Sequence, residues 1–550
     1  VCSKRTVILR NNSSFFLLNK KKCIYLKMGE NMKKSFLFPL VVLFNLMFCF
    51  ADVNAILSVN PYFLLNNYPA APIYYDDAQS DYLWEVQNPN TWNNLDSNWW
   101  MKRQDYWLQA YDNPSFLDFG FEVDTKNFDL VLRVDIMQDL LPCLEDFGSV
   151  KTNIPFVGGL LDLTFPRVSY MDFISNDKSW YVSLGRRLIK WGPAFYDTML
   201  SNSQPYLDNL WVDYKTPIKA DSNWKFNFNY VIVSPKFWLQ YHDADKGEEP
   251  NEILKTFIGH KFSFYNDYVR LSLGEFANVY NKVPSLFDLS PLVVWHNGNQ
   301  DGYVNVALYL AAEGKVGPIR IYGTYVQDDF DLPHETHSDK PMAMGFVAGA
   351  EYHILDGVPV ESEQFTRNDY VLREDNFDYK SGFNVGFEWY FVSPMMYNRS
   401  SEHSAGKFTI PAQIISLSGK NYIYDKDAYF LGFKYGPNAR LFRLFAEYIN
   451  KPFEVTSSVE LLTRGEYGIE SFYGNRDKLD EMGVIDMLKL AGAKTSVLLF
   501  ETDFAYYLQD SLKLVADLDL QFDFTHKKNA YKIGVGFSCN PLTTDWKNLF

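Results

Sequence analysis

The stretch LKLVADLDLQFDF, residues 512 to 524, carries an apolar residue at every second position. Successive side chains of an extended strand point to opposite sides, so the leucines and phenylalanines share one face, while Asp517, Asp519 and Asp523 share the other. At about 3.3 Å per residue and a tilt of about 45°, the strand covers roughly 30 Å, the thickness of a bilayer core. An ordinary globular strand has only about 5 to 6 residues. The stretch therefore predicts a membrane-spanning strand, with the three aspartates as candidate lumen residues.

Similar alternating segments recur from residue 116 to the end of the chain. They are the ranges 128–136, 224–232, 261–264, 304–311, 318–327, 342–352, 383–391, 428–435, 441–450 and 496–508. Some meet at tight turns, such as 313–317 and 509–511, and others are separated by long polar loops, such as 328–340 and 397–407. Short turns that alternate with long loops are typical of an outer-membrane barrel, whose turns lie on the periplasmic side.

The number of strands follows from the length of the barrel region, residues 112–550. At roughly 24 residues for each strand with its connection, this region holds about 18 strands, within a range of about 16 to 18. The predicted fold is all-β: a closed antiparallel transmembrane β-barrel with a short N-terminal non-barrel segment. A soluble β-sandwich is the alternative, because alternation also faces a dry core between two sheets.

The composition agrees with this fold class. The chain is 17% aromatic and 22% charged, and its mean hydropathy is −0.22. Such an average argues against a bundle of membrane helices but suits a barrel, where half of each strand faces a polar interior. The formal net charge of −15 at pH 7 argues against nucleic-acid binding, which needs a basic surface.

The region before the barrel divides into three predicted parts. Residues 1–31 begin without Met and are rich in Lys, so we expect them to be a spurious upstream extension. Residues 32–55 contain two lysines, about 15 apolar residues and a small-residue site, which predicts a secretory signal peptide cut after Ala55. Residues 56–111, rich in Asn, Tyr and Trp, are predicted to be a periplasmic or plug segment. Only Cys143 and Cys539 remain after such a cut, and the sequence leaves their pairing open.

The segment GRRLIKWGPAFYDTMLSNSQPY, residues 185–206, is unlike the rest of the chain. Its Gly and Pro residues permit a sharp turn, Trp191 offers a flat surface, and Arg186 can fork onto a carboxylate or phosphate. One interpretation is a periplasmic turn, or a loop folded into the lumen, held by Trp191. The other is direct ligand binding, and the first is favoured.

This segment resembles the capsule assembly family of outer-membrane barrels, the Wzi family. In that family a strand ending in Gly-Arg leads to Trp-Gly-Pro and a Ser/Asn stretch closed by Pro. The matching residues here are Gly185, Arg186, Trp191, Gly192, Pro193, Ser201, Asn202 and Pro205, with a weaker echo from Asn299 through IRIYGTYVQDDF to Asp328 and Asp329. The resemblance implies a barrel of about 18 strands that binds or anchors surface polysaccharide in the outer membrane of a diderm bacterium. It brings no catalytic residues.

Partners and the alternative function follow from the same features. The last alternating stretch, YKIGVGFSC at 531–539, resembles the terminal-strand signal of barrel proteins, so the expected partners are outer-membrane lipid, the barrel assembly machinery and surface polysaccharide. The alternative function is a porin-like channel for small solutes, since a lumen with polar walls conducts unless it is filled.

Enzyme chemistry is not expected. The sequence contains no nucleophile elbow, P-loop or dinucleotide fingerprint, and no cofactor is predicted. His334 and His337 lie near Asp339, but a solvated loop is favoured over a metal site. The acidic run 243–252 is best explained as a soluble outer loop.

Overall fold

A computed structural model provides the structure of the chain. It describes residues 14–18, 23–27, 52–66, 115–137, 160–162, 166, 168–201, 206–218, 222–234, 255–295, 302–329, 342–356, 371–373, 382–399, 405–416, 422–467, 480–481, 483, 488–525 and 527–544.

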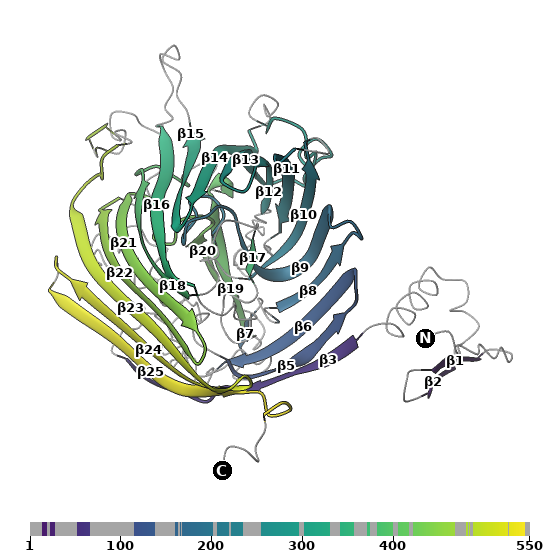
Figure 1. The fold of residues 1–550 in the computed structure, drawn as a ribbon. Helices are drawn as coiled ribbons and strands as arrows, with labels where there is room; N and C mark the ends of the chain where they lie inside the picture. The colour runs from purple at the N-terminus through teal and green to yellow at the C-terminus, as the bar shows by residue number, and fades with distance from the viewer. Residues whose placement is uncertain are drawn as a thin grey trace, which may run out of the picture.

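The described strands form a closed antiparallel barrel of 18 wall strands (Figure 1), which confirms the predicted fold class. The first wall strand is interrupted at residues 60–61 and consists of β3 (Asp52–Val59) and β4 (Tyr62–Asn66). The others are β5 (Ser115–Asp124), β6 (Phe128–Met137), β8 (Val168–Ile174), β9 (Trp180–Lys190), β10 (Leu207–Pro217), β11 (Lys225–Val233), β12 (Lys255–Tyr265), β13 (Val269–Tyr280), β14 (Val304–Val316), β15 (Ile319–Asp329), β16 (Ala343–Leu355), β18 (Gly382–Val392), β21 (Ala439–Asn450), β22 (Phe453–Gly465), β23 (Lys494–Gln509), β24 (Leu512–Asp523) and β25 (Lys528–Cys539). The barrel closes where β25 pairs with β3 and β4.

The two ends of the barrel differ in their connections. Neighbouring strands run in opposite directions, so alternate connections lie at the same end. One end, the turn end, holds tight connections such as 317–318 and 510–511, together with the start of β3 and the end of β25. The other, the loop end, holds the longer connections 191–206, 234–254, 281–303 and 393–438. The connection 356–381 is an exception, since it is long and belongs to the turn end.

The outer face of the wall is apolar. On β24, Leu514 points outward and is 45% exposed, whereas Lys513 and Asp523 point inward and are buried. Exposed apolar side chains occupy alternate positions of other strands as well, among them Leu271, Leu273, Ile319, Ile321, Phe442, Leu444, Ile533, Val535 and Phe537. Such a band is the surface that a barrel presents to lipid. In the described part of the chain, no helix has the length and apolarity to cross a membrane.

Exposed aromatic residues mark the turn end of this band. Trp180 begins β9, and its ring lies 4.6 Å from that of Tyr214 near the end of β10. Trp224, Tyr268 and Tyr352 are also exposed close to this end. Aromatic girdles of this kind lie at the membrane interface of outer-membrane barrels, because their rings suit the boundary between water and hydrocarbon.

The lumen contains further strands (Figure 1). β7 (Leu160–Asp162), β19 (Thr409–Ser416) and β20 (Tyr422–Phe430) form a three-stranded sheet separate from the wall. The expectation of a wall strand over 428–435 is therefore wrong, because β20 ends at Phe430 and the chain then turns inside the barrel. β17 (Val371–Arg373) pairs in parallel with residues 188–190 at the end of β9.

The start of the barrel differs from the predicted boundaries. We expected the wall to begin near residue 112 and a cut after Ala55, but Ala55 lies within β3 and faces Phe121 of β5. The physical reason is closure, because β25 needs an antiparallel partner and β3 and β4 supply it. Export by a leader stays a prediction, since residues 28–51 lie outside the described part. Most of the predicted periplasmic or plug segment, residues 67–111, also lies outside the described part. In the predicted upstream extension, β1 (Ser14–Leu18) and β2 (Cys23–Lys27) form a separate hairpin.

Candidate functional site

Gly185 and Arg186 lie on β9, which pairs with β8 on one side and with β10 on the other. Gly185 has φ +144°, and a Cβ there would lie 2.3 Å from the carbonyl oxygen of Ser169, so only glycine fits. Arg186 donates from Nε and Nη2 to the two carboxylate oxygens of Asp208 at 2.9 and 2.8 Å. The guanidinium group of Arg186, which the sequence suggested as a ligand-binding group, is therefore paired with a carboxylate of the adjacent strand β10.

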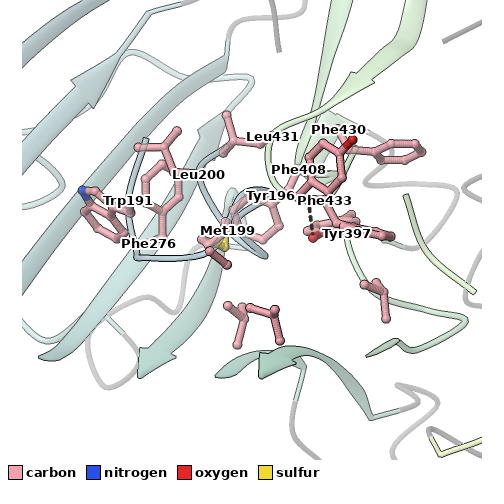
Figure 2. Packing of buried hydrophobic residues seen from close by; sticks show 14 of the residues in the cluster. Trp191, Tyr196, Met199, Leu200, Phe276, Tyr397, Phe408, Phe430, Leu431 and Phe433 are labelled. Carbon is pink, nitrogen blue, oxygen red and sulfur yellow. Dashed lines mark hydrogen bonds between the residues drawn. The ribbon is translucent and has the colours of Figure 1, made fainter. Parts of the chain in front are cut away.

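Trp191 is fully buried inside the barrel (Figure 2). Its ring packs against Gly259 of β12, where a Cβ would lie 2.5 Å from Cη2. Its Nε1 donates to Oδ1 of Asn229 at 2.7 Å, and Lys261 Nζ lies 4.7 Å from the ring centroid. The backbone N–H of Trp191 donates to the carbonyl of Leu200 at 2.9 Å, which closes the loop. Residues 191–201 thus form a loop that is folded into the lumen and anchored by Trp191.

Gly192 and Pro193 shape the start of this loop. Gly192 has φ +70°, and a Cβ would lie 2.1 Å from Oδ2 of Asp197 and 2.5 Å from Oη of Tyr309. Both the backbone conformation and the close approach require glycine. The carbonyl of Pro193 accepts a hydrogen bond of 3.2 Å from Nη2 of Arg320 on β15. The motif residues thus make contacts within the protein.

Asp197 holds the loop in its folded form. Its Oδ1 accepts the backbone N–H groups of Met199 at 2.8 Å and Leu200 at 3.2 Å, and its Oδ2 accepts the hydroxyl of Tyr309 at 3.1 Å. Burial raises the pKa of Asp197 to about 6, against the hydrogen bonds that stabilise its anion. Ser201, also buried, donates its N–H to the carbonyl of Leu431 at 3.0 Å and joins this loop to the next.

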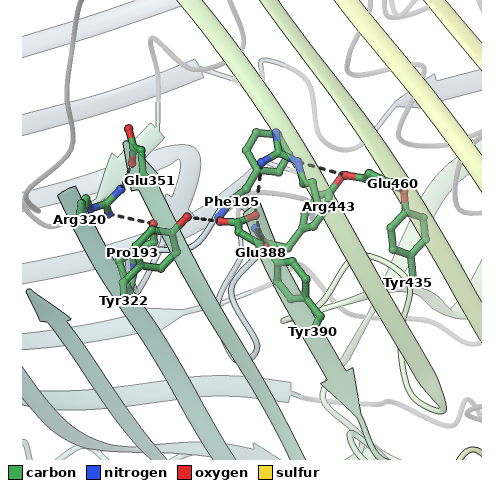
Figure 3. A network of polar contacts seen from close by, with 11 residues as sticks. Pro193, Phe195, Arg320, Tyr322, Glu351, Glu388, Tyr390, Tyr435, Arg443 and Glu460 are labelled. Atoms are coloured by element: carbon green, nitrogen blue, oxygen red, sulfur yellow. Dashed lines mark hydrogen bonds and ion pairs between the residues drawn. The ribbon is translucent and has the colours of Figure 1, made fainter. Parts of the chain in front are cut away.

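A buried carboxylate on β18 receives the tip of the loop (Figure 3). Glu388 Oε1 accepts the N–H of Phe195 at 2.8 Å and the hydroxyl of Tyr322 at 2.7 Å. Glu388 Oε2 accepts the hydroxyl of Tyr390 at 2.6 Å and lies 3.3 Å from Nη1 of Arg443. Its charge is therefore paired and hydrogen-bonded, as a buried charge requires.

A second buried carboxylate continues the network on β22 (Figure 3). Glu460 accepts the hydroxyls of Tyr196 at 3.1 Å and Tyr435 at 2.7 Å, and it lies 3.3 Å from Nε of Arg443. Arg443 also lies over the ring of Phe195, 3.9 Å from its centroid. One arginine thus pairs with two wall carboxylates and packs on the inserted loop.

The connection between β18 and β21 also folds inward and interlocks with the Trp191 loop. The N–H of Tyr397 donates to Oδ2 of Asp328 at 2.8 Å, and the hydroxyl of Tyr397 donates to the carbonyl of Thr198 at 2.5 Å. The N–H of Phe433 donates to that same hydroxyl at 2.9 Å. Asp328, which the sequence had singled out, therefore holds the second loop.

Polar side chains of the inner wall bind the backbone of this second loop. Asn278 Nδ2 donates to the carbonyl of Lys407 at 2.9 Å, and Asn305 Nδ2 donates to that of Gly406 at 3.1 Å. Lys255 Nζ lies 3.1 Å from the carbonyl of Thr409. We call residues 191–201, 393–399, 405–410 and 430–438 the plug; its apolar core unites Trp191, Tyr196, Met199, Leu200, Tyr397, Phe408, Phe430, Leu431 and Phe433 with inward side chains of the wall.

Three of the other candidate residues lie on β24, in contacts that the structure shows with residues outside the plug. Asp517 and Asp519 lie on the inner face of β24, where Lys532 Nζ reaches them at 3.3 and 2.8 Å. Asp523, near the loop end of β24, accepts the N–H of Thr525 at 3.0 Å. Asp329 lies at a register shift that ends β15. Asn202, Pro205, Asn299, the pair His334 and His337, the acidic run 243–252 and Cys143 lie outside the described residues, whereas Cys539 is described as a free, buried thiol.

Glu388, Arg443 and Glu460 were not among the residues predicted from the sequence. A signal for them exists, because each stands between large apolar residues at an inward position, as in FEWYF at 387–391 and LFRLF at 441–445. A charge at such a place indicates a buried polar partner. In the part of the chain that the structure describes, no group of three or more His, Cys, Asp or Glu residues is arranged to hold a metal ion.

Comparison with known proteins gives structural likeness only. No protein-family profile matches the chain. No curated protein matches it either. The outer-membrane protein Wzi of Escherichia coli, a carbohydrate-binding barrel involved in group 1 capsule assembly, is 11% identical, with a TM-score of 0.45 over 91% of this chain and 86% of that one.

Two further solved structures are also similar. OccK5 (OpdH) of Pseudomonas aeruginosa is 7% identical, with a TM-score of 0.38 over 88% of this chain and 97% of that one. The outer-membrane channel DcaP of Acinetobacter baumannii is 9% identical, with a TM-score of 0.32 over 89% and 97%. The fold of this chain, a barrel with an apolar outer band, rests on its own strand pairing.

Proposed function

We propose that this protein is a non-enzymatic outer-membrane barrel that is closed by its own plug and binds or anchors surface polysaccharide. The observation that carries the proposal is the plug, whose polar groups are bonded to the inner wall through Asn229, Arg320 and Glu388. A loop held by so many wall contacts is suited to a fixed seal, because a gate needs contacts that break at small cost.

Two features support polysaccharide as the ligand. One is the residue pattern from Gly185 to Ser201, which resembles the capsule assembly family. The other is Tyr303 at the loop end, which is 45% exposed and lies against Tyr280 with the ring centroids 6.1 Å apart. An exposed aromatic face stacks on sugar rings, and neighbouring polar groups then bond the hydroxyls.

Glycan binding by the refolded full chain tests the ligand. On an array of bacterial surface polysaccharides, we expect binding that Tyr303→Ala weakens several-fold. Tyr268→Ala is the matched control, because Tyr268 is 65% exposed but lies at the turn end. Equal loss in both variants, or no binding by the parent protein, would contradict the proposal.

A porin-like channel is the second candidate, favoured by one observation. Asp503 on β23 faces Asp517 of β24 on the inner side of the barrel, and Asp503 is exposed, which gives this side a water-accessible carboxylate. A channel beside the plug that is lined by Asp503 and Asp517 would favour cations. Planar-bilayer recording separates the candidates: the sealed barrel is silent, whereas the channel conducts and loses cation selectivity in Asp503→Asn.

A further inference from the structure

The connection between β13 and β14 folds over the outside of the barrel at the loop end. Gly259 and His260 are neighbours on β12, so their side chains point to opposite faces of the wall. Gly259 contacts Trp191 in the lumen. His260 therefore faces outward, and the ring of Trp295 stacks on it with centroids 4.4 Å apart. The chain from Asn281 to Trp295, which we call the outer strap, thus lies against the lipid-facing side.

The outer strap covers polar groups that the wall places on its outer face. Glu275 stands opposite His260 in the register of β12 and β13, with Oε2 3.8 Å from Nε2. The N–H of Trp295 donates to Glu275 Oε2 at 2.8 Å, and the hydroxyl of Tyr230 donates to the carbonyl of Leu289 at 2.7 Å. An apolar cluster of Tyr230, Ile258, Ala277, Val279, Trp295 and Val304 surrounds them. The strap and the wall are therefore packed together.

The polarity of the outer strap is the reverse of that of a loop in water. Asp288 is 2% exposed, and its Oδ2 accepts the N–H of Ser285 at 2.7 Å and the Ser285 hydroxyl at 2.8 Å. Lys282 Nζ lies 3.3 Å from the same oxygen. Most of the exposed side chains are apolar: Val283 is 78% exposed, Leu286 89%, Leu292 74% and Val294 54%, whereas Asn281 and Ser285 are the exposed polar residues of the strap. A loop surrounded by hydrocarbon is expected to bond its polar groups within the protein and to expose apolar groups, and the contacts of Asp288 and the exposed Val283, Leu286, Leu292 and Val294 follow this pattern.

We propose that the outer strap is inserted in the membrane and that its exposed apolar side chains are covered by the acyl chains of the leaflet at the loop end. The strap leaves β13, where Leu271 and Leu273 are each 51% exposed, and it leads into β14, where Leu310 is 38% exposed. Its apolar surface is therefore continuous with the lipid-facing band. The inference rests on the barrel spanning a membrane and is independent of any polysaccharide.

Collisional quenching in vesicles tests this insertion. The full chain, with its native cysteines replaced by serine, carries a bimane label at Leu286→Cys, at Leu273→Cys in the apolar band, or at Glu481→Cys, which is exposed at the same loop end. Each variant is refolded into phosphatidylcholine vesicles with or without brominated acyl chains. Heat-modifiable gel mobility checks that each variant has folded.

We expect brominated lipid to quench the label at 286 at least half as strongly as the label at 273. Iodide should quench it several-fold more weakly than the label at 481. Iodide quenching equal to that at 481 would place the strap in water and overturn the proposal. Protection from both quenchers, with cross-linked dimers, would mean that a second copy of the chain covers the strap, and this outcome overturns it as well.

Discussion

Two connections at the loop end place a tryptophan against the same strand, but on opposite faces. Trp191 contacts Gly259 from inside, and Trp295 stacks on His260 from outside. Both rings are almost wholly buried, at 0% and 1% exposure. The inner loop is bonded to the wall by many polar side chains, whereas the outer strap satisfies most of its polar groups within itself.

The difference reflects what surrounds each loop. The inner wall is polar at alternate positions, so a loop that enters the lumen must match those groups, as Trp191 does through its 2.7 Å bond to Asn229. Trp295 Nε1, by contrast, has no hydrogen-bond partner in the described structure. The two faces of one wall therefore suit two kinds of loop. The inner loop bonds to polar side chains of the wall, and the outer strap forms most of its hydrogen bonds within itself.

Replacing each tryptophan by alanine should give the largest effect. Trp191→Ala removes the centre of the plug core and is expected to lower the free energy of unfolding by about 3–5 kcal/mol, because it leaves a cavity in a packed interior. It should also admit ion conductance in planar bilayers. Trp295→Ala should lower stability less, because lipid can fill the space, and its bilayers should stay silent. Conductance in Trp295→Ala but not in Trp191→Ala would reverse the assignment of the two loops.

The two faces of β24 provide the next test. Leu518→Arg places a charge on the lipid face and should cost about 2–4 kcal/mol in barrel stability. Asp519→Asn, on the inner face, should cost less, because Lys532 keeps Asp517 as a partner at 3.3 Å. Urea unfolding in lipid vesicles measures both. Similar midpoints for the two variants would argue that the face carrying Leu518 does not meet lipid.

Two glycines with positive φ separate backbone strain from crowding. Gly192→Ala and Gly317→Ala both place alanine in the left-handed region, which costs about 1–2 kcal/mol. Only at Gly192 does the new Cβ meet other atoms, since nothing lies within 4 Å at Gly317. Gly192→Ala should therefore be less stable than Gly317→Ala by a further 1–3 kcal/mol or so. Equal thermal midpoints would mean that the loop around Gly192 shifts to make room for the new Cβ at little cost in free energy.

The pH dependence of the plug tests a single buried carboxyl group. Burial raises the pKa of Asp197 from its ordinary 3.8 to about 6, so the folded protein binds this proton more tightly than the unfolded chain does. Stability from this group is greatest below pH 4 and falls as the pH rises to about 6, by at most about 1.4 kcal/mol per pH unit. The difference in the free energy of unfolding between the parent protein and Asp197→Asn should change with pH only in this window, as urea unfolding at a series of pH values would measure. Parallel curves would show that Asp197 keeps its ordinary pKa.

Periodicity predicted the wall well because each wall strand alternates between two solvents. The segment 512–524 became β24, and the range 128–136 lies in β6. Periodicity failed at 428–435, because the described residues 430–435 lie in the plug and are surrounded by protein, so the alternation of their sequence does not mark a boundary between lipid and lumen. It also missed β3, where a strand of mixed polarity follows directly on the apolar run that suggested export.

The Trp191 segment was recognisable by composition, but its partners were not. Gly192 and Pro193 marked a sharp turn, which the structure contains. Glu388 and Glu460 are separated from this turn by about 200 residues or more in sequence, and only the register of the closed barrel brings them to the tip of the loop. No local pattern encodes that register, since it depends on every strand between them.

β17 ties the plug to a connection that belongs to the turn end of the barrel. It belongs to the connection 356–381, which begins and ends at the turn end, yet it pairs with residues 188–190, directly before Trp191. Leu372 of β17 is buried in the plug core. The residues directly before Trp191 are therefore held from two directions, by their own strand β9 and by the backbone pairing with β17, a segment whose connection starts and finishes at the far end of the barrel.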